Sequence, residues 1–183
     1  MSEQQRGITL IGMPGCGKST VGRLLAARLG LEFVDTDRVI EACTGRRLQQ
    51  IIDGEGAASL RTIEQDVLGR VDAHARVVAT GGSAVYADAA MRHLATASTI
   101  VHLDVGLPEL EQRVTDWATR GLVRTPGQDM AELLTERSQL YRRHADIRVT
   151  CDGLTPEQVV EHVIAALLSH GDSAVERTAA SPP

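Results

Sequence analysis

The sequence predicts an α/β fold in three layers, with a five-stranded parallel sheet covered by helices on both faces. Two observations lead to this prediction. Short apolar runs alternate along the chain with longer amphipathic segments, as they do in strand–helix–strand units. A glycine-rich segment also separates the first apolar run from the first helical one, which is typical of a strand–loop–helix unit. Crossover helices of this kind join strands that run parallel.

Five short runs of apolar and β-branched residues are the predicted strands. They lie at 7–11, 32–35, 76–80, 99–105 and 147–150. The amphipathic segments predict helices at 19–29, 37–52, 57–73, 88–95, 107–118, 130–144 and 156–169. A chain of 183 residues is most simply one domain, which we place at 1–170.

Two further segments have the composition of loops. Residues 119–129 lie between two predicted helices and contain glycine, proline and threonine, which predicts a mobile lid. Residues 171–183 are small, polar and proline-ended, which predicts a disordered tail.

The composition argues against several classes of protein. A net charge of −5 and a pI near 5.7 do not suit a general nucleic-acid surface, and only four aromatic residues are present to stack bases. Three cysteines without metal-type spacing favour a reduced, cytoplasmic compartment. No signal-like N-terminus and no long apolar run is present. We expect a monomer with neither nucleic-acid nor membrane partners.

The glycine-rich segment contains the only lysine of the chain, beside eighteen arginines elsewhere. Residues 12–19 match the pattern Gly-x-x-x-x-Gly-Lys-Ser/Thr, which predicts a phosphate loop for a nucleoside triphosphate. In that pattern Lys18 reaches the β- and γ-phosphates and the Ser19 hydroxyl binds Mg²⁺. We assign no chemical role to the side chain of Cys16. The candidate ATP-binding residues of the loop are Gly12, Pro14, Gly15, Cys16, Gly17, Lys18, Ser19 and Thr20.

Polar residues follow the second strand, where ligands of open α/β sheets bind. Asp35 is a candidate to hold Mg²⁺ through water, and Asp37 is a candidate to accept a proton from a substrate hydroxyl. The structural alternative is that Asp37 caps a helix.

Three further groups of residues have both a functional and a structural interpretation. Arg61 and Glu64 share a helix face, where they either belong to a ligand-binding site or form a surface ion pair. The glycine pair at 81–82 either lets backbone approach a ligand or forms a plain turn. Arg137, with Arg120 and Arg124 in the lid, suits a carboxylate substrate and phosphoryl transfer, although solvated arginines are the alternative.

Taken together, these motifs resemble those of the shikimate kinases, which are small P-loop enzymes of the nucleoside-monophosphate-kinase type. The similarity covers roughly residues 7–168. The matching segments are the phosphate loop at 12–20, Asp-Thr-Asp at 35–37, Leu-Arg-Thr-Ile-Glu at 60–64, Gly-Gly-Ser at 81–83 and Arg-x-x-Leu-Tyr…Ala-Asp at 137–146. The resemblance implies transfer of the γ-phosphoryl of ATP to shikimate, giving shikimate 3-phosphate for aromatic amino acid biosynthesis, with Mg²⁺ as cofactor.

The resemblance also implies residue roles. Arg61 and Arg137 would bind the substrate carboxylate, and Glu64 would orient Arg61. Asp37 and the backbone of Gly82 would meet the substrate hydroxyls. The implied catalytic set is Lys18, Asp37 and Arg120, with Arg124 as a rival to Arg120 as the lid arginine. Arg113 and Pro156 would flank the adenine.

Four positions depart from the family pattern. Leu60 and Ile52 replace pocket aromatics, Ser83 replaces a third glycine, and Gly121 replaces a lid proline. A kinase of the same fold that acts on another hydroxy acid or hydroxy amino acid, such as homoserine, is therefore an alternative. A non-catalytic ATP-binding regulator is a second alternative.

Overall fold

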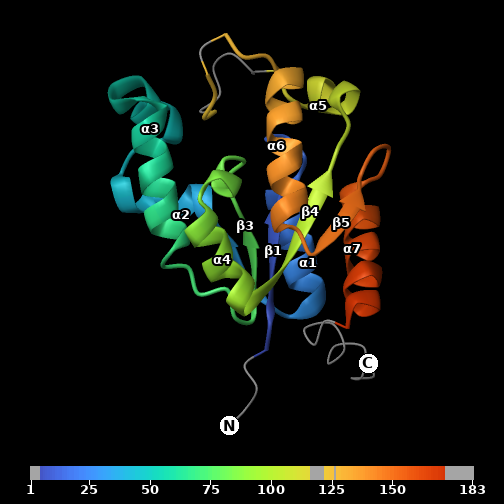
Figure 1. Cartoon of the computed structure of the whole chain (residues 1–183). Helices are drawn as coiled ribbons and strands as arrows, with labels where there is room; N and C mark the ends of the chain where they lie inside the picture. Colours follow the sequence, from blue (N-terminus) through green and yellow to red (C-terminus); the bar gives the residue numbers. More distant parts are fainter. Residues whose placement is uncertain (1–4, 116–121, 126, 172–183) are drawn as a thin grey trace.

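The computed structural model describes residues 5–115, 122–125 and 127–171, and its strands form one sheet (Figure 1). The strands are β1 (Gly7–Ile11), β2 (Glu32–Asp35), β3 (Arg76–Ala79), β4 (Ser98–Asp104) and β5 (Ile147–Thr150). Their order is β2-β3-β1-β4-β5, and every neighbouring pair is parallel. The predicted α/β class and its five parallel strands are confirmed, with strand ends shifted by no more than a residue.

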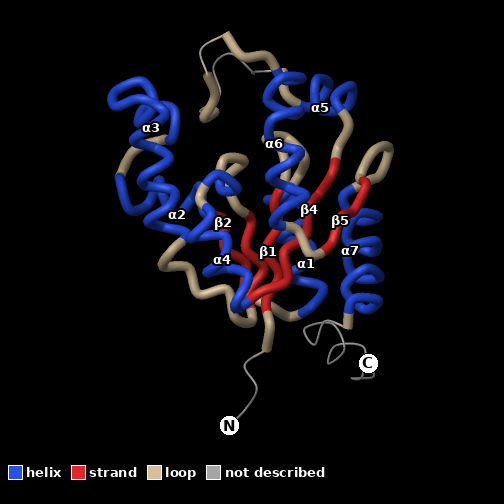
Figure 2. Tube along the Cα trace, viewed as in Figure 1, coloured by secondary structure: helices blue, strands red, loops and turns tan. Residues whose placement is uncertain are grey.

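Helices cover both faces of this sheet, as Figure 2 shows. They are α1 (Lys18–Leu29), α2 (Thr36–Thr44), α3 (Leu48–Leu68), α4 (Asp88–Ala97), α5 (Leu107–Arg113), α6 (Met130–His144) and α7 (Pro156–His170), with a 3₁₀ turn η1 (Ala84–Tyr86). The chain moves from β1 to β2 in one direction and from β3 to β4 in the other. Right-handed crossovers in opposite directions place α1 and α4 on opposite faces.

Three predicted helices have boundaries that differ by several residues from those in the structure. The helix expected at 37–52 ends at Thr44, because Gly45 takes the left-handed conformation with a φ of 67° and caps α2. The next helix, α3, runs from Leu48 to Leu68, and the break expected before residue 57 is a kink at Gly56 within it. The helix expected at 107–118 ends at Arg113, because Val114 leaves helical geometry.

Apolar side chains form two clusters. The main one packs the sheet against its helices, and β1 is buried along its whole length because both its faces are covered. A smaller cluster joins Ile40 of α2, Ile51 and Leu60 of α3, and Val123 of the segment that precedes α6. The α2–α3 unit thus has its own apolar contacts beside the carboxyl ends of the strands.

The predicted tail at 172–183 and much of the predicted lid, including Arg120 and Gly121, lie outside the described residues. Among the helices of the described ranges, none has the length and apolar character needed to cross a membrane.

Candidate active site

The phosphate loop leaves β1 and leads directly into α1, which begins at Lys18. Gly15 and Gly17 have φ values of 82° and 100°, a region that favours glycine. A β-carbon on Gly15 would also lie 2.2 Å from Cγ2 of Val114, so the loop packs closely against the end of α5. A loop of this shape at a helix N-terminus offers backbone N–H groups to an anion.

Lys18 is nearly buried beside this loop. Its Nζ donates hydrogen bonds to the carbonyl oxygens of Gly12 at 2.8 Å and Met13 at 2.9 Å. The ammonium group is therefore held at the loop by backbone acceptors, in contact with the cavity described next.

A cavity of about 570 Å³ lies at the carboxyl ends of the strands. The candidate residues that line it are Pro14, Gly15, Gly17, Lys18, Ser19, Thr20, Asp35, Asp37, Gly82 and Arg137. The described candidates outside its lining are Gly12, Cys16, Arg61, Arg113, Arg124 and Pro156. Leu60 and Glu64 of α3 also line the cavity. Residues from α1, α2, α3 and α6 therefore meet at one cavity, although Lys18 and Arg137 are more than a hundred positions apart in the chain.

The Asp-Thr-Asp segment joins β2 to α2. Asp35, rather than Asp37, caps the helix, because its Oδ1 accepts a hydrogen bond from the backbone N–H of Asp37 at 3.2 Å. The alternative in which Asp37 is the cap is therefore wrong. The two aspartates line the cavity, with buried Thr36 between them.

Three helices hold the turn at 81–83, which we call the glycine turn. The N–H of Gly81 donates to Oγ1 of Thr36 at 3.1 Å, and the carbonyl of Gly82 accepts from the Tyr141 hydroxyl at 3.0 Å. The Ser83 hydroxyl donates to Oε2 of Glu64 at 2.5 Å. Hydrogen bonds with Thr36, Tyr141 and Glu64 thus hold the glycine turn at the edge of the cavity.

Replacing Tyr141 with phenylalanine is expected to lower the free energy of unfolding by about 1–2 kcal/mol, because the carbonyl of Gly82 loses the donor that the fully buried Tyr141 supplies. Urea unfolding measures this change. Ser169→Ala, which removes an exposed hydroxyl from α7, should change stability by less than about 0.5 kcal/mol. An equally small effect of Tyr141→Phe would show that the hydroxyl does not hold the turn.

Arg137 is the most deeply buried cation of the site, at 1% exposure. One terminal nitrogen, Nη2, donates to the carbonyl of Val123 at 2.5 Å, and Nε donates to the Tyr86 hydroxyl at 3.4 Å. Arg61 is exposed, and its guanidinium carbon lies 4.6 Å from the centre of the Tyr86 ring. The two arginines thus meet at one tyrosine, but only Arg137 lines the cavity.

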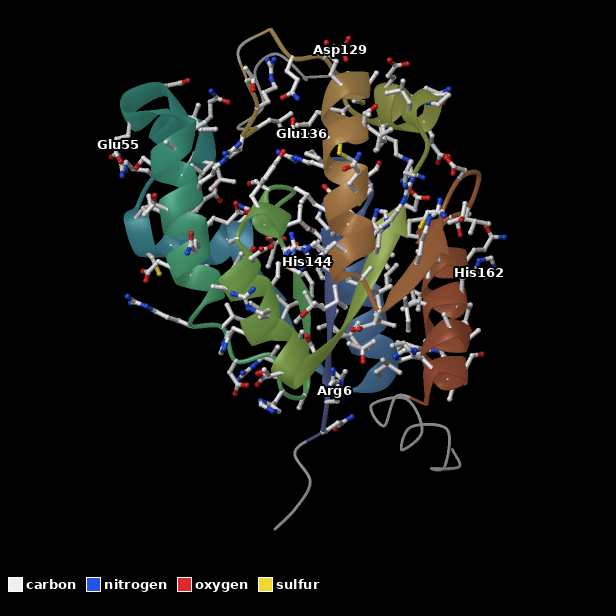
Figure 3. All side chains as sticks on the ribbon, in the orientation of Figure 1. Arg6, Glu55, Asp129, Glu136, His144 and His162 are labelled. Carbon is white, nitrogen blue, oxygen red and sulfur yellow. The ribbon has the colours of Figure 1, made fainter. Side chains whose placement is uncertain are left out.

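The segment that precedes α6 is attached to this tyrosine through Glu136, which is labelled on α6 in Figure 3. Glu136 accepts from the Tyr86 hydroxyl at 2.5 Å and from the Gln128 amide at 2.7 Å. Gln128 in turn accepts from Arg124 at 3.0 Å through its backbone carbonyl. The described part of the predicted lid is therefore connected through Tyr86 to Arg137, which lines the cavity.

Of the two residues expected beside adenine, Arg113 contacts the phosphate loop. Arg113 donates to the carbonyl of Cys16 at 3.4 Å and pairs with Glu109. Glu109 also accepts from the N–H of Gly153 at 2.9 Å, just before Pro156 opens α7. Glu109 thus joins α5 to the loop that precedes α7, and Arg113 joins α5 to the phosphate loop.

Burial dominates the electrostatics of Glu64. It raises the pKa of the Glu64 carboxyl to about 7, and the Ser83 hydroxyl opposes this shift by donating to it. Among the described residues, no hydrogen bond or ion pair joins Glu64 to Arg61, so the expected pairing of these two is not present. The Glu64 carboxyl points to the glycine turn, whereas the Arg61 guanidinium lies on the Tyr86 ring, outside the cavity lining.

Glu64→Gln is expected to alter how stability depends on pH. A folded-state pKa near 7, against 4.5 ordinarily, means that the folded protein holds this proton more tightly, so the free energy of unfolding falls as pH rises between these values. The loss amounts to about 3 kcal/mol in all. Urea unfolding at about pH 5 and about pH 8 should show this loss in the wild type but not in Glu64→Gln. Glu55→Gln, at an exposed carboxylate of α3, should keep it.

The departures from the family pattern lie in different places. Leu60 and Ser83 line the cavity, whereas Ile52 packs against the smaller apolar cluster.

Residues that the sequence interpretation gave no role include Tyr86 and His102. His102 stacks on Tyr141 with ring centres 4.7 Å apart, and burial lowers its pKa to about 4. Only the short distance of Tyr86 from the glycine pair in the sequence could have drawn attention to it.

A parallel sheet in this order, with a lysine-bearing phosphate loop and a cavity at its carboxyl edge, defines a P-loop kinase of the nucleoside-monophosphate-kinase type. Within that class, the chain belongs to the shikimate kinase family. The family model described as shikimate kinase matches residues 14–168. The chain is thus a phosphotransferase with an alcohol group as acceptor.

Individual relatives agree with this assignment. The shikimate kinase of Salinispora tropica is 43% identical over 162 residues, covering 87% of this chain and 96% of the relative. That of Mycobacterium avium is 40% identical over 163 residues, covering 86% and 91%. The solved structure of shikimate kinase from Acinetobacter baumannii in complex with shikimate has a TM-score of 0.84 and 33% identity, covering 92% of this chain and 96% of that one.

Proposed function

We propose that this chain transfers the γ-phosphoryl group of ATP to a hydroxyl of shikimate, giving shikimate 3-phosphate and ADP. One observation supports this most directly: a single cavity is lined both by Lys18 of the phosphate loop and by the buried Arg137. A cation inside a cavity suits an acceptor that carries a carboxylate. The relative solved with shikimate supports the choice of this acid.

The proposed reaction is an in-line displacement. The acceptor hydroxyl oxygen forms a bond to the γ-phosphorus, while the bond from that phosphorus to the β–γ bridging oxygen breaks and ADP leaves. Asp37 takes the proton of the hydroxyl, since its carboxylate lines the cavity beside the glycine turn. Lys18 stabilises the charge on the transferred group, and Arg120 of the lid is proposed to do the same.

The residues near Lys18 suit Mg²⁺. Magnesium ions bound with nucleotides take one or two oxygen ligands from the protein and keep several waters. The Ser19 hydroxyl and the Asp35 carboxylate line the cavity beside the phosphate loop. We propose that they hold the ion directly and through water, respectively, and that the ion neutralises phosphate charge when bound.

The remaining roles follow the placement of each side chain. Arg137 is proposed to bind the acceptor carboxylate and Gly82 to meet a hydroxyl, while Arg61 supports the site from Tyr86. Arg113 and Pro156 are proposed to flank the adenine. We also propose that the enzyme acts as a monomer in the cytoplasm, where its three free cysteines stay reduced.

ADP release with MgATP tests the proposed function. The acceptor panel is shikimate, homoserine, gluconate and nucleoside monophosphates. Saturable turnover with shikimate alone is the expected result. Turnover with another acceptor and none with shikimate would refute the choice of acceptor, and ATP binding without turnover on any acceptor would identify a regulator instead.

A further inference from the structure

The Ser83 hydroxyl binds Glu64 to the glycine turn. Ser83 is 8% exposed, and its Oγ donates to Oε2 of Glu64 at 2.5 Å. The other oxygen of Glu64 lies against the first residue of the turn, since a β-carbon on Gly81 would be 2.2 Å from Oε1. The Glu64 carboxyl thus contacts the first and the third residue of the turn at once.

Arg137 keeps one terminal nitrogen on the cavity side of the same turn. Its Nε and Nη2 donate to the Tyr86 hydroxyl and the Val123 carbonyl, and the guanidinium also interacts with the Tyr141 hydroxyl, but no carboxylate in the described part of the chain pairs with Nη1. Nη1 would lie 2.9 Å from a β-carbon on Gly82, so it faces the turn beside the cavity. No ion pair joins Arg137 to Glu64 within the described residues, although the two charges are close enough to influence each other.

We propose that Ser83 is a positioning residue of the acceptor site, because its hydroxyl keeps the Glu64 carboxyl on the glycine turn and so leaves the Nη1 of Arg137 without a carboxylate partner until the acceptor binds. This inference rests on the proposed function, since it assumes an acceptor that carries a carboxylate. A buried carboxylate that loses its donor turns to the nearest cation. At this site it would compete with the acceptor for Arg137.

This competition requires the ionised form of Glu64. The charged groups around the carboxyl are Lys18 from α1, Asp37 from α2 and Arg137 from α6, and burial brings its pKa to about 7. Glu64 is therefore mostly neutral at about pH 6 and mostly ionised at about pH 8.5. The loss of the Ser83 hydroxyl should therefore weaken acceptor binding at about pH 8.5 but not at about pH 6.

The test measures KM for shikimate and for ATP at these two pH values in the wild type, Ser83→Ala, Glu64→Gln and the double variant. At about pH 8.5, Ser83→Ala should raise the shikimate KM about tenfold, and at about pH 6 by less than about twofold. KM for ATP should stay within about twofold throughout. In the Glu64→Gln background, the same serine substitution should change the shikimate KM less than about twofold at both values.

Two further variants keep this test decisive. Ser138→Ala removes a hydroxyl that donates to the carbonyl of Leu134 on α6, outside the cavity, and should leave both KM values unchanged. Ser83→Gly replaces Ser83→Ala if the latter does not fold. An equal rise of the shikimate KM at both pH values, or one that persists in the Glu64→Gln background, would overturn the proposal. Failure of the wild type to phosphorylate shikimate would instead refute the proposed function.

Discussion

Lys18→Ala is expected to lower kcat with shikimate by about a thousandfold or more, while the protein remains folded. The ammonium group lies at the phosphate loop, held by two backbone carbonyls, and no other lysine exists in the chain to replace it. An arginine cannot replace it, because the compact ammonium of lysine fits the crowded loop, whereas the larger planar guanidinium of arginine does not. Steady-state ADP release, with circular dichroism to confirm folding, measures the effect.

A matched control removes a cation from the same helix. Arg28→Ala on α1 breaks only an exposed ion pair with Glu161 and should keep kcat within about twofold. Near-normal turnover of Lys18→Ala would show that the lysine does not stabilise the transferred group, and the assignment of the phosphate loop would fail with it.

Arg137→Ala is expected to raise the shikimate KM about a hundredfold and the ATP KM by less than about threefold. Arg137 is buried and lines the same cavity as the phosphate loop. Arg137→Lys should recover only part of the loss, because lysine keeps the charge but not the fork that binds a carboxylate through two hydrogen bonds.

The control for Arg137 lies on the same helix. Arg142→Ala removes an exposed guanidinium from α6 and should leave both KM values within about twofold. Because Arg137 also binds the carbonyl of Val123, ATP binding by calorimetry must show that the variant retains its fold. Equal increases in the two KM values would mean that Arg137 does not bind the acceptor carboxylate.

Local chemistry made most of the fold predictable. The central strands β1 and β4 are apolar runs buried on both faces, so their positions follow from the apolar pattern of the sequence. Helix boundaries were harder to predict where one glycine decides them. Gly45 ends α2 but Gly56 only kinks α3, and sequence does not distinguish a capping glycine from one inside a kinked helix.

The candidate site was predictable in its parts but not in its contacts. The phosphate loop and the Asp-Thr-Asp segment follow directly from motifs whose residues are neighbours in the chain. The partner of Glu64 did not follow: helical spacing favoured Arg61, three positions earlier, whereas the structure places the carboxyl on Ser83, nineteen positions later. Burial decides between these partners, because a carboxylate inside the protein takes the donor that is buried with it.

The sequence by itself determined the fold class, the phosphate loop and the family resemblance, because these depend on local spacing and residue type. The tertiary structure decided which side chains share the cavity, that Asp35 caps α2, and that Tyr86 contacts both arginines. These outcomes depend on how α2, α3 and α6 pack around the carboxyl ends of the strands. Packing joins residues that are distant in the chain, and no local pattern records it.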